Sequence, residues 1–517
     1  MNGAYQIFPE KRCRLMSDSA ASGMDIKKIA QGTFFIFSIT FFGLGLNYLY
    51  GIFLARWLGA ERFGLYALGL SVFNLLASIS LMGLDNAALR FIPGVSIAGH
   101  VPSVKNMIRN ILKLGCLTGA GAAILLAVFG PYLSNGLYKT RDLEPVFLAF
   151  AVAIPAYVCS STLLSILQAL QNVRWRMFVK YVSEPVARFI LTTILLLLGL
   201  ALKAALIGFI VALWGSVVFG YVGLTLIMKE IGTRMDPVGH SEPGKPDLMG
   251  YVLPLLFGLL FGAVASRSDV LLLGYFNGAR DTGMYAASLM TAAIIAIILQ
   301  SLESFMAPLL SESLALGIRK NTQDIFSFSL RWGVLLGFPL LFCFCLFSRE
   351  ILGFYGEAFQ SAALCLVLLT VGQFINIATG SANSILLFSG KSKVVMINEL
   401  FKSILQIVLN ILLIPMYGIT GAAISMLVAL TAINVLRLIE VYKMLGIHPY
   451  ERELMKPVVA ASTISLLIIL GKEWIPGNAA LVMIPVGTGL YFLLLVLMGL
   501  KDQDKKAVEA IFRRVSI

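Results

Sequence analysis

Two ionisable residues, Arg267 and Asp269, lie in an apolar stretch of the sequence, where a charged side chain is costly unless it faces water or a partner. A guanidinium suits bidentate binding of a phosphate, so Arg267 is the sharpest candidate for an anion-binding residue. The alternative for Arg267 is a structural ion pair. Residues i and i+2 do not face each other on a helix, so Asp269 is a poor partner for it. For Asp269 itself, a structural role is favoured over ion coupling.

The composition predicts the environment in which these two residues lie. Of the 517 residues, 58% are hydrophobic and only 13% are charged, against about 45–50% and about 25% in soluble globular domains. Because so few charged residues cannot cover the surface of a soluble protein, the chain is predicted to fold in a bilayer. This excludes a cytosolic enzyme, a nucleic-acid binder and a secreted disulfide scaffold, despite the net charge of +13. The six cysteines form no metal-binding spacing, and neither a metal site nor a cofactor is expected.

A helix needs about 20 apolar residues to cross a bilayer. Windows of that size predict fourteen membrane-spanning helices, at approximately 30–55, 64–85, 108–133, 145–168, 182–202, 204–228, 249–276, 284–307, 325–348, 361–388, 398–416, 418–438, 457–473 and 478–499. Most of the 40 lysine and arginine residues then fall on the side of the N-terminus. By the positive-inside rule, both termini are predicted to be cytoplasmic and the protein to lie in the cytoplasmic membrane.

An internal repeat organises these spans. The motif G-A-x-x-x-G-x-Y-A occurs at 59–67 and again at 278–286, an offset of 219 that also maps Gly199 onto Gly418. Because six spans separate the copies, the fold class is predicted to be all-α, with two six-helix lobes related by a pseudo-twofold axis along the membrane normal. Two C-terminal helices follow. The predicted segments are an N-tail (1–29), an N-lobe (30–228), a polar cytoplasmic linker (229–248), a C-lobe (249–440), two extra spans (441–499) and a basic tail (500–517).

Three motifs carry a family resemblance: ARWLGAERFGLYA at 55–67, SDVLLLG at 268–274 leading to GMYA at 283–286, and YGITGAA at 417–423. Over about residues 25–440 the sequence resembles the polysaccharide transport branch of the multidrug/oligosaccharidyl-lipid/polysaccharide exporter superfamily. The resemblance implies two lobes around a central cavity, alternating access, and a substrate of sugars on a polyprenyl (di)phosphate. The function expected is therefore that of a flippase for such a precursor.

A lipid-linked sugar needs fixed cations for its phosphates and polar or aromatic groups for its sugars. The cavity candidates in the first span are polar or aromatic: Asn47, Tyr48 and Tyr50. At the offset of 219, Tyr48 and Tyr50 correspond to Arg267 and Asp269. Helix packing is the favoured alternative for these tyrosines. Candidates for a gate or a coupling residue are Glu303, Asp85 and Arg90, of which the last two could pair across a turn.

A basic group on the predicted cytoplasmic side could attract a diphosphate to an entrance: Arg174, Arg176, Lys180 and Arg188. The favoured alternative for this group is topology together with contact to anionic lipids. The expected partners are the lipid-linked glycan and membrane lipids, without nucleic acid. Glycosyltransferases or a polymerase of the same pathway are further candidate partners.

Two other functions compete with the flippase. A cation-coupled exporter of drugs or metabolites is disfavoured because the first span has no carboxylate and because Arg267 is a cation. A membrane-embedded glycosyltransferase or polymerase is disfavoured because the predicted outside loops hold only scattered acids. No phosphate-binding loop of the Gly-rich, Lys-Ser/Thr type is present, and the protein is not expected to be an enzyme.

Overall fold

The computed structural model describes residues 26–97, 101–234, 262–472 and 481–499, and every regular element in these ranges is a helix. A bilayer offers no water to exposed backbone N–H and C=O groups, so a chain this apolar pairs them within helices. Nine helical stretches of this part of the chain are long and apolar enough to cross a membrane. The chain is a multi-pass membrane protein. Residues 1–25 of the expected N-tail, 235–248 of the linker and the tail at 500–517 lie outside the described residues.

We call α2 to α8 the N-half and α10 to α16 the C-half. The helices of the N-half are α2 (Ile26–Leu81), α3 (Leu84–Ile97), α4 (Val101–Tyr132), η1 (Leu133–Leu137), α5 (Leu143–Ala169), α6 (Val173–Phe178), η2 (Val179–Ser183), α7 (Glu184–Leu197) and α8 (Ala201–Arg234). Those of the C-half are α10 (Ser268–Phe276), α11 (Ala279–Ala315), α12 (Arg319–Leu346), α13 (Ser348–Gly353), η3 (Glu357–Ala362), α14 (Ala363–Ile377), α15 (Ala382–Phe388) and α16 (Ser392–Leu445). They are followed by η4 (Arg452–Leu454), α17 (Met455–Lys472) and α18 (Met483–Leu497).

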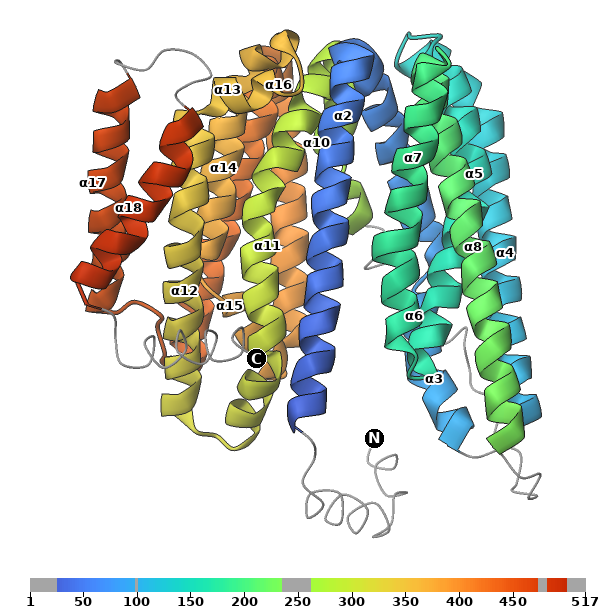
Figure 1. Cartoon of the computed structure of the whole chain (residues 1–517), viewed down its shortest axis with the longest axis horizontal. Helices are drawn as coiled ribbons and strands as arrows, with labels where there is room; N and C mark the ends of the chain where they lie inside the picture. The colour runs from blue at the N-terminus through green and yellow to red at the C-terminus, as the bar shows by residue number, and fades with distance from the viewer. Residues whose placement is uncertain (1–25, 98–100, 235–261, 473–480, 500–517) are drawn as a thin grey trace.

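The two halves lie on opposite sides of the bundle (Figure 1). Helices α3 to α8 form one side and α11 to α16 the other, with the first part of α2 between them. Helices α17 and α18 lie at the outer edge of the C-half, and α12 is the helix they pack against. We call the end at which α2 begins, at the bottom of Figure 1, the lower end.

Two long helices reverse direction at glycines. At about 1.5 Å per residue, the 54 residues of α16 would extend about 80 Å if straight, far more than the roughly 30 Å of a hydrocarbon core. Gly418 breaks the helix at φ 55° and ψ −131°. Gly59 does the same within α2, at φ 74° and ψ 170°. Glycine reaches these backbone angles because it has no Cβ, so each long helix consists of two helices joined at a turn.

Backbone conformation recurs at the offset found in the sequence. Three pairs of residues with positive φ are separated by 219 positions: Gly59 and Gly278, Gln171 and Gly390, and Gly199 and Gly418. In the first pair ψ is also similar, 170° and −174°. Helix boundaries follow the same spacing, since α5 at 143–169 corresponds to α14 and α15 at 363–388.

The two copies of the G-A-x-x-x-G motif pack against each other at the upper end. A Cβ added to Gly64 would overlap the carbonyl oxygen of Ala279, and one added to Gly283 would overlap that of Ala60. The contact is reciprocal, as expected for equivalent surfaces that meet about a twofold axis. Small residues at this spacing let helix backbones approach closely in membranes, so the repeat motif joins α2 to α11.

The buried apolar residues show how the halves are joined. One cluster contains residues of both halves and of α17 and α18, and includes Phe63, Leu273 and Tyr491. A second cluster belongs to α3, α4, α5, η2 and α8 of the N-half alone. A third, at the end of the C-half nearest Leu310 and Phe326, has no N-half member. The halves therefore share a core toward the upper end and have separate cores toward the lower end.

Candidate functional site

Arg188 on α7 is the centre of a polar contact between two helices of the N-half. Its Nη2 donates a hydrogen bond to Oδ1 of Asn47 on α2. Its guanidinium carbon lies 4.9 Å from the ring centroid of Tyr50, a cation–π contact. The Tyr50 hydroxyl is 3.2 Å from Oγ1 of Thr192. Two of the cavity candidates from the first span, Asn47 and Tyr50, thus hold an arginine.

Glu184 lies one helical turn before Arg188 on the same face of α7 and interacts with its charge. The carboxylate also hydrogen-bonds to Ser216 on α8 and interacts with the ammonium of Lys180. Ser216 in turn accepts a 2.9 Å hydrogen bond from Ser160 on α5. Glu184 therefore balances one of the cations that surround it.

Arg267 lies at the N-terminus of α10. It is partly exposed, and in the described part of the chain its guanidinium has no hydrogen-bond or ion-pair partner. It interacts electrostatically with Tyr157 on α5, a residue that also interacts with Glu184 and Asp85. Tyr157 thus interacts electrostatically both with Arg267 of the C-half and with the acidic residues of the N-half.

Asp269 lies inside the C-half and is 2% exposed. Its carboxylate accepts a 2.6 Å hydrogen bond from the hydroxyl of Tyr285 on α11 and a 2.8 Å hydrogen bond from the backbone N–H of Val270. The corresponding residues of the N-half, Tyr50 and Tyr66, are also hydrogen-bonded to each other. The same contact is therefore made in both halves, with a carboxylate in one and a phenol in the other.

Tyr48 makes its contact across the two halves. Its ring packs edge-on against Tyr355, which follows α13, with 6.5 Å between ring centroids. The two hydroxyl groups are also hydrogen-bonded, and the Tyr355 hydroxyl lies 2.8 Å from Oγ1 of Thr291. Tyr48 therefore belongs to a contact that joins the halves.

Glu303 belongs to a separate polar cluster within the C-half. Its carboxylate accepts a 2.8 Å hydrogen bond from Ser384 on α15 and interacts with the charge of Arg437. Arg437 forms an ion pair with Glu399, which is also 2.9 Å from Lys402 Nζ. These residues connect α11, α15 and both parts of α16.

The gate candidates Asp85 and Arg90 and the candidates at the predicted entrance divide into two groups. Asp85 interacts electrostatically with Arg176 and Lys180. Partial loss of solvation lowers the pKa of Arg176 from its ordinary value, while Tyr181 and Asp85 raise it. By contrast, Arg174 is exposed, and exposed Arg90 lies over the neighbouring Phe91 ring, with 5.5 Å from Cζ to the ring centroid.

The structure thus relates one set of residues from several helices, which we call the interhalf cluster: Asn47, Tyr50, Asp85, Tyr157, Arg176, Lys180, Glu184, Arg188 and Arg267. The sequence analysis did not identify Glu184 or Tyr157. Glu184 could have been found by the criterion that selected Arg267, because it is a charged residue inside a predicted span. Among the described residues, no group of His, Cys, Asp and Glu could hold a metal ion.

Comparison with known families identifies the chain. The model of the family described as "Polysaccharide biosynthesis protein" matches residues 29–314, more than half of the sequence. The chain belongs to this family. A second family model, MatE, matches residues 254–412 of this polysaccharide biosynthesis protein. The resemblance stated from the sequence motifs is confirmed.

Relatives and solved structures agree with this assignment. The probable low-salt glycan biosynthesis flippase Agl15 of Haloferax volcanii is 24% identical over 405 residues, which are 77% of this chain and 80% of the relative. The fold is similar to that of the lipid II flippase MurJ in an inward closed conformation, with a TM-score of 0.69 at 15% identity, covering 90% of this chain and 98% of that one. It is also similar to an inward-facing multidrug resistance MATE transporter, with a TM-score of 0.64 at 12% identity, covering 78% and 94%. The protein is a membrane transporter of the multidrug/oligosaccharidyl-lipid/polysaccharide exporter superfamily.

Proposed function

We propose that this polysaccharide biosynthesis protein flips a polyprenyl-(di)phosphate-linked oligosaccharide or polysaccharide precursor across the cytoplasmic membrane by alternating access. The observation that carries the proposal is the interhalf cluster. The proposal is supported by the electrostatic interaction of Tyr157 with both Arg267 of the C-half and Glu184, the neighbour of Arg188, in the N-half. Family membership and the similarity to Agl15 support a glycan substrate.

The charges of the cluster suit a diphosphate. Four cations, Arg176, Lys180, Arg188 and Arg267, stand with two carboxylates, Asp85 and Glu184, and leave two positive charges. A diphosphate diester carries a charge of about −2 and presents oxygens that a guanidinium binds in pairs. The two carboxylates keep the cations from holding the head group so tightly that it cannot leave. Asn47 and Tyr157, both partly exposed, would supply hydrogen bonds to the sugars, while the buried Tyr50 holds Arg188 in place.

The proposal includes fourteen crossings in two six-helix lobes, with two extra spans and both termini in the cytoplasm. The reversals at Gly59 and Gly418 give each long helix two crossings. The conformations that recur at the offset of 219 support equivalent lobes. The separate apolar cores support a path that opens between the halves toward the lower end, which this orientation places at the cytoplasmic face.

A reconstitution experiment tests the proposal. Purified protein in liposomes receives a fluorescent polyprenyl-diphosphate oligosaccharide, and the fraction that becomes accessible from the opposite leaflet is measured. Arg267→Ala is compared with Arg280→Ala, a matched control because Arg280 is exposed at the N-terminal end of α11. We expect protein-dependent flipping that falls at least tenfold in Arg267→Ala and is unchanged in Arg280→Ala.

Two outcomes contradict the proposal in different ways. Equal flipping by both variants would keep the function but remove Arg267 from the site. Absence of flipping for every lipid-linked glycan, together with ion-gradient-driven transport of a small cation or drug, would instead establish the alternative of a cation-coupled exporter.

A further inference from the structure

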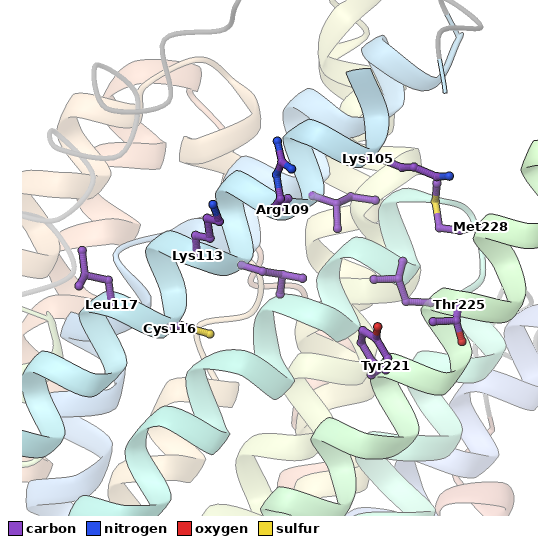
Figure 2. A pocket seen from close by; sticks show the side chains of 11 residues that line it. Lys105, Arg109, Lys113, Cys116, Leu117, Tyr221, Thr225 and Met228 are labelled. Carbon is purple, nitrogen blue, oxygen red and sulfur yellow. The ribbon is translucent and has the colours of Figure 1, made fainter. Parts of the chain in front are cut away.

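A cationic groove lies on the N-half, between the lower parts of α4 and α8 (Figure 2). Its volume is about 770 Å³. One wall carries Lys105, Arg109 and Lys113 of α4, and the other carries Tyr221 and Thr225 of α8. All five side chains are exposed. We call this surface the α4–α8 groove.

The three cations are spaced four residues apart, so they lie in a row on one face of α4. Like charges at this spacing destabilise a helix. Helix α4 contains no acidic residue, and in the described part of the chain none of the three cations forms an ion pair. Arg109 donates a 3.0 Å hydrogen bond to the amide oxygen of Asn106, which leaves its charge uncompensated. No carboxylate among the described side chains compensates the row, so its charge is complementary to an anion from outside the chain.

The remainder of the groove is apolar. Leu112, Leu117 and Leu224 line it with Cys116, and α4 carries no charged residue from there to its end at Tyr132. The row from Lys105 to Lys113 covers about 12 Å along the helix axis. A ligand that fits this surface has an anionic head at the lower end and an apolar chain that extends toward the middle of the membrane.

The groove differs from the corresponding face of the C-half in charge and in being uncovered in the described chain. At the offset of 219, the three cations of α4 correspond to Asp324, Phe328 and Trp332 of α12. That helix is covered by the chain itself, because α17 and α18 pack against it and the Tyr491 hydroxyl donates a 3.1 Å hydrogen bond to the carbonyl oxygen of Leu335. Leu335 corresponds to Cys116, which lines the α4–α8 groove. The N-half has no equivalent covering helices in the described chain.

We propose that the α4–α8 groove binds an anionic glycerophospholipid of the leaflet nearest the lower end. Its phosphate lies among Lys105, Arg109 and Lys113, and an acyl chain lies against Leu117. Basic pockets between membrane helices are suited to anionic head groups. The groove is formed by α4 and α8 alone, so this site is distinct from the interhalf cluster, and the lipid is a bound component of the membrane, separate from the transported substrate.

Chemical labelling of Cys116 measures directly whether the groove is occupied, because this residue is exposed and lines the groove. The full-length protein in detergent is treated with a maleimide, and labelling of Cys116 is followed by peptide mass spectrometry while phosphatidylglycerol or phosphatidylcholine is added. Native mass spectrometry counts the lipids that remain bound. We expect phosphatidylglycerol to protect Cys116 at a concentration at least tenfold lower than phosphatidylcholine.

A charge-matched pair of variants tests the cations. In Lys105→Gln/Arg109→Gln/Lys113→Gln, the preference for phosphatidylglycerol should be lost. In the control Lys139→Gln/Arg141→Gln/Lys203→Gln, which removes three exposed basic residues from the upper end of the same half, the preference should remain.

Four results would overturn the inference: equal protection by both lipids, equal loss of preference in the two triple variants, protection by inorganic phosphate alone, or displacement of phosphatidylglycerol by a polyprenyl-diphosphate glycan. The third would indicate a free phosphate site. The fourth would make the groove part of the transport path. Because the measurement follows lipid binding, its result is independent of whether the protein flips the proposed substrate.

Discussion

Gly64 and Gly283 lie against each other across the two halves, and a Cβ on either would fall 2.9 Å from the backbone nitrogen of the other. They occupy the same position in the two copies of the repeated motif. The contact is between backbones, so an added methyl group cannot be accommodated by the rotation of a side chain.

We predict that Gly64→Ala lowers the thermal stability of the detergent-solubilised protein. Overpacking of a close contact costs about 1–3 kcal/mol, and here the overlapping atom is a backbone oxygen of Ala279. Gly45→Ala is the matched control on the same helix, since a Cβ there meets nothing within 4 Å. Equal unfolding temperatures for the two variants would show that the halves do not meet at Gly64.

The sequence predicts this repeat but not the contact that it makes. Composition and apolar windows are sufficient for a helical membrane protein, and the offset of 219 anticipates the equivalence of Gly59 and Gly278. Whether two equivalent segments touch each other depends on how the halves are oriented, which is a tertiary property. The interhalf cluster shows the same limit, since Tyr157 is an ordinary residue of an apolar span until Glu184 and Arg267 are placed near it.

The partners of Tyr50 and Asp269 show a second limit of prediction from the sequence. Sequence spacing makes Tyr50 the counterpart of Asp269 but cannot show that each is hydrogen-bonded to the tyrosine sixteen residues later. That partner is selected by the packing of α10 on α11 and of the two parts of α2. A role for Asp269 in substrate binding stays a prediction.

The equivalent positions of Tyr66 and Tyr285 lead to a prediction about stability. Tyr285→Phe should destabilise the protein more than Tyr66→Phe. A hydrogen bond to a charged group contributes about 1.5–3 kcal/mol, against about 0.5–1.5 kcal/mol for a neutral pair, and loss of the Tyr285 hydroxyl leaves a buried carboxylate with one fewer donor. Chemical denaturation in detergent measures both variants. A larger effect of Tyr66→Phe would indicate that Asp269 is not ionised.

Glu184 and Arg188 should behave as a coupled pair. Glu184→Gln leaves the half-buried Arg188 without the carboxylate one helical turn before it, and an i,i+4 charge pair of this kind contributes about 0.5 kcal/mol. The double variant Glu184→Gln/Arg188→Gln should therefore be destabilised by less than the sum of the two single effects. Thermal unfolding of the two single variants and the double variant gives the coupling energy. Additive effects would show that the two charges do not interact.

The contact between Tyr48 and Tyr355 tests alternating access, which requires the upper ends of the halves to separate. In Tyr48→Cys/Tyr355→Cys, a bis-methanethiosulfonate reagent long enough to span the space of the two rings, whose native centroids are 6.5 Å apart, should join the two positions through reducible disulfides. Flipping should stop on cross-linking and return on reduction. The wild-type chain provides the control under the same treatment, since Cys116 and Cys159, with sulfur atoms 3.1 Å apart, lie within the N-half and their linkage leaves the halves free to move. Flipping that continues in the fully cross-linked double variant would mean that transport does not require the halves to part at this contact.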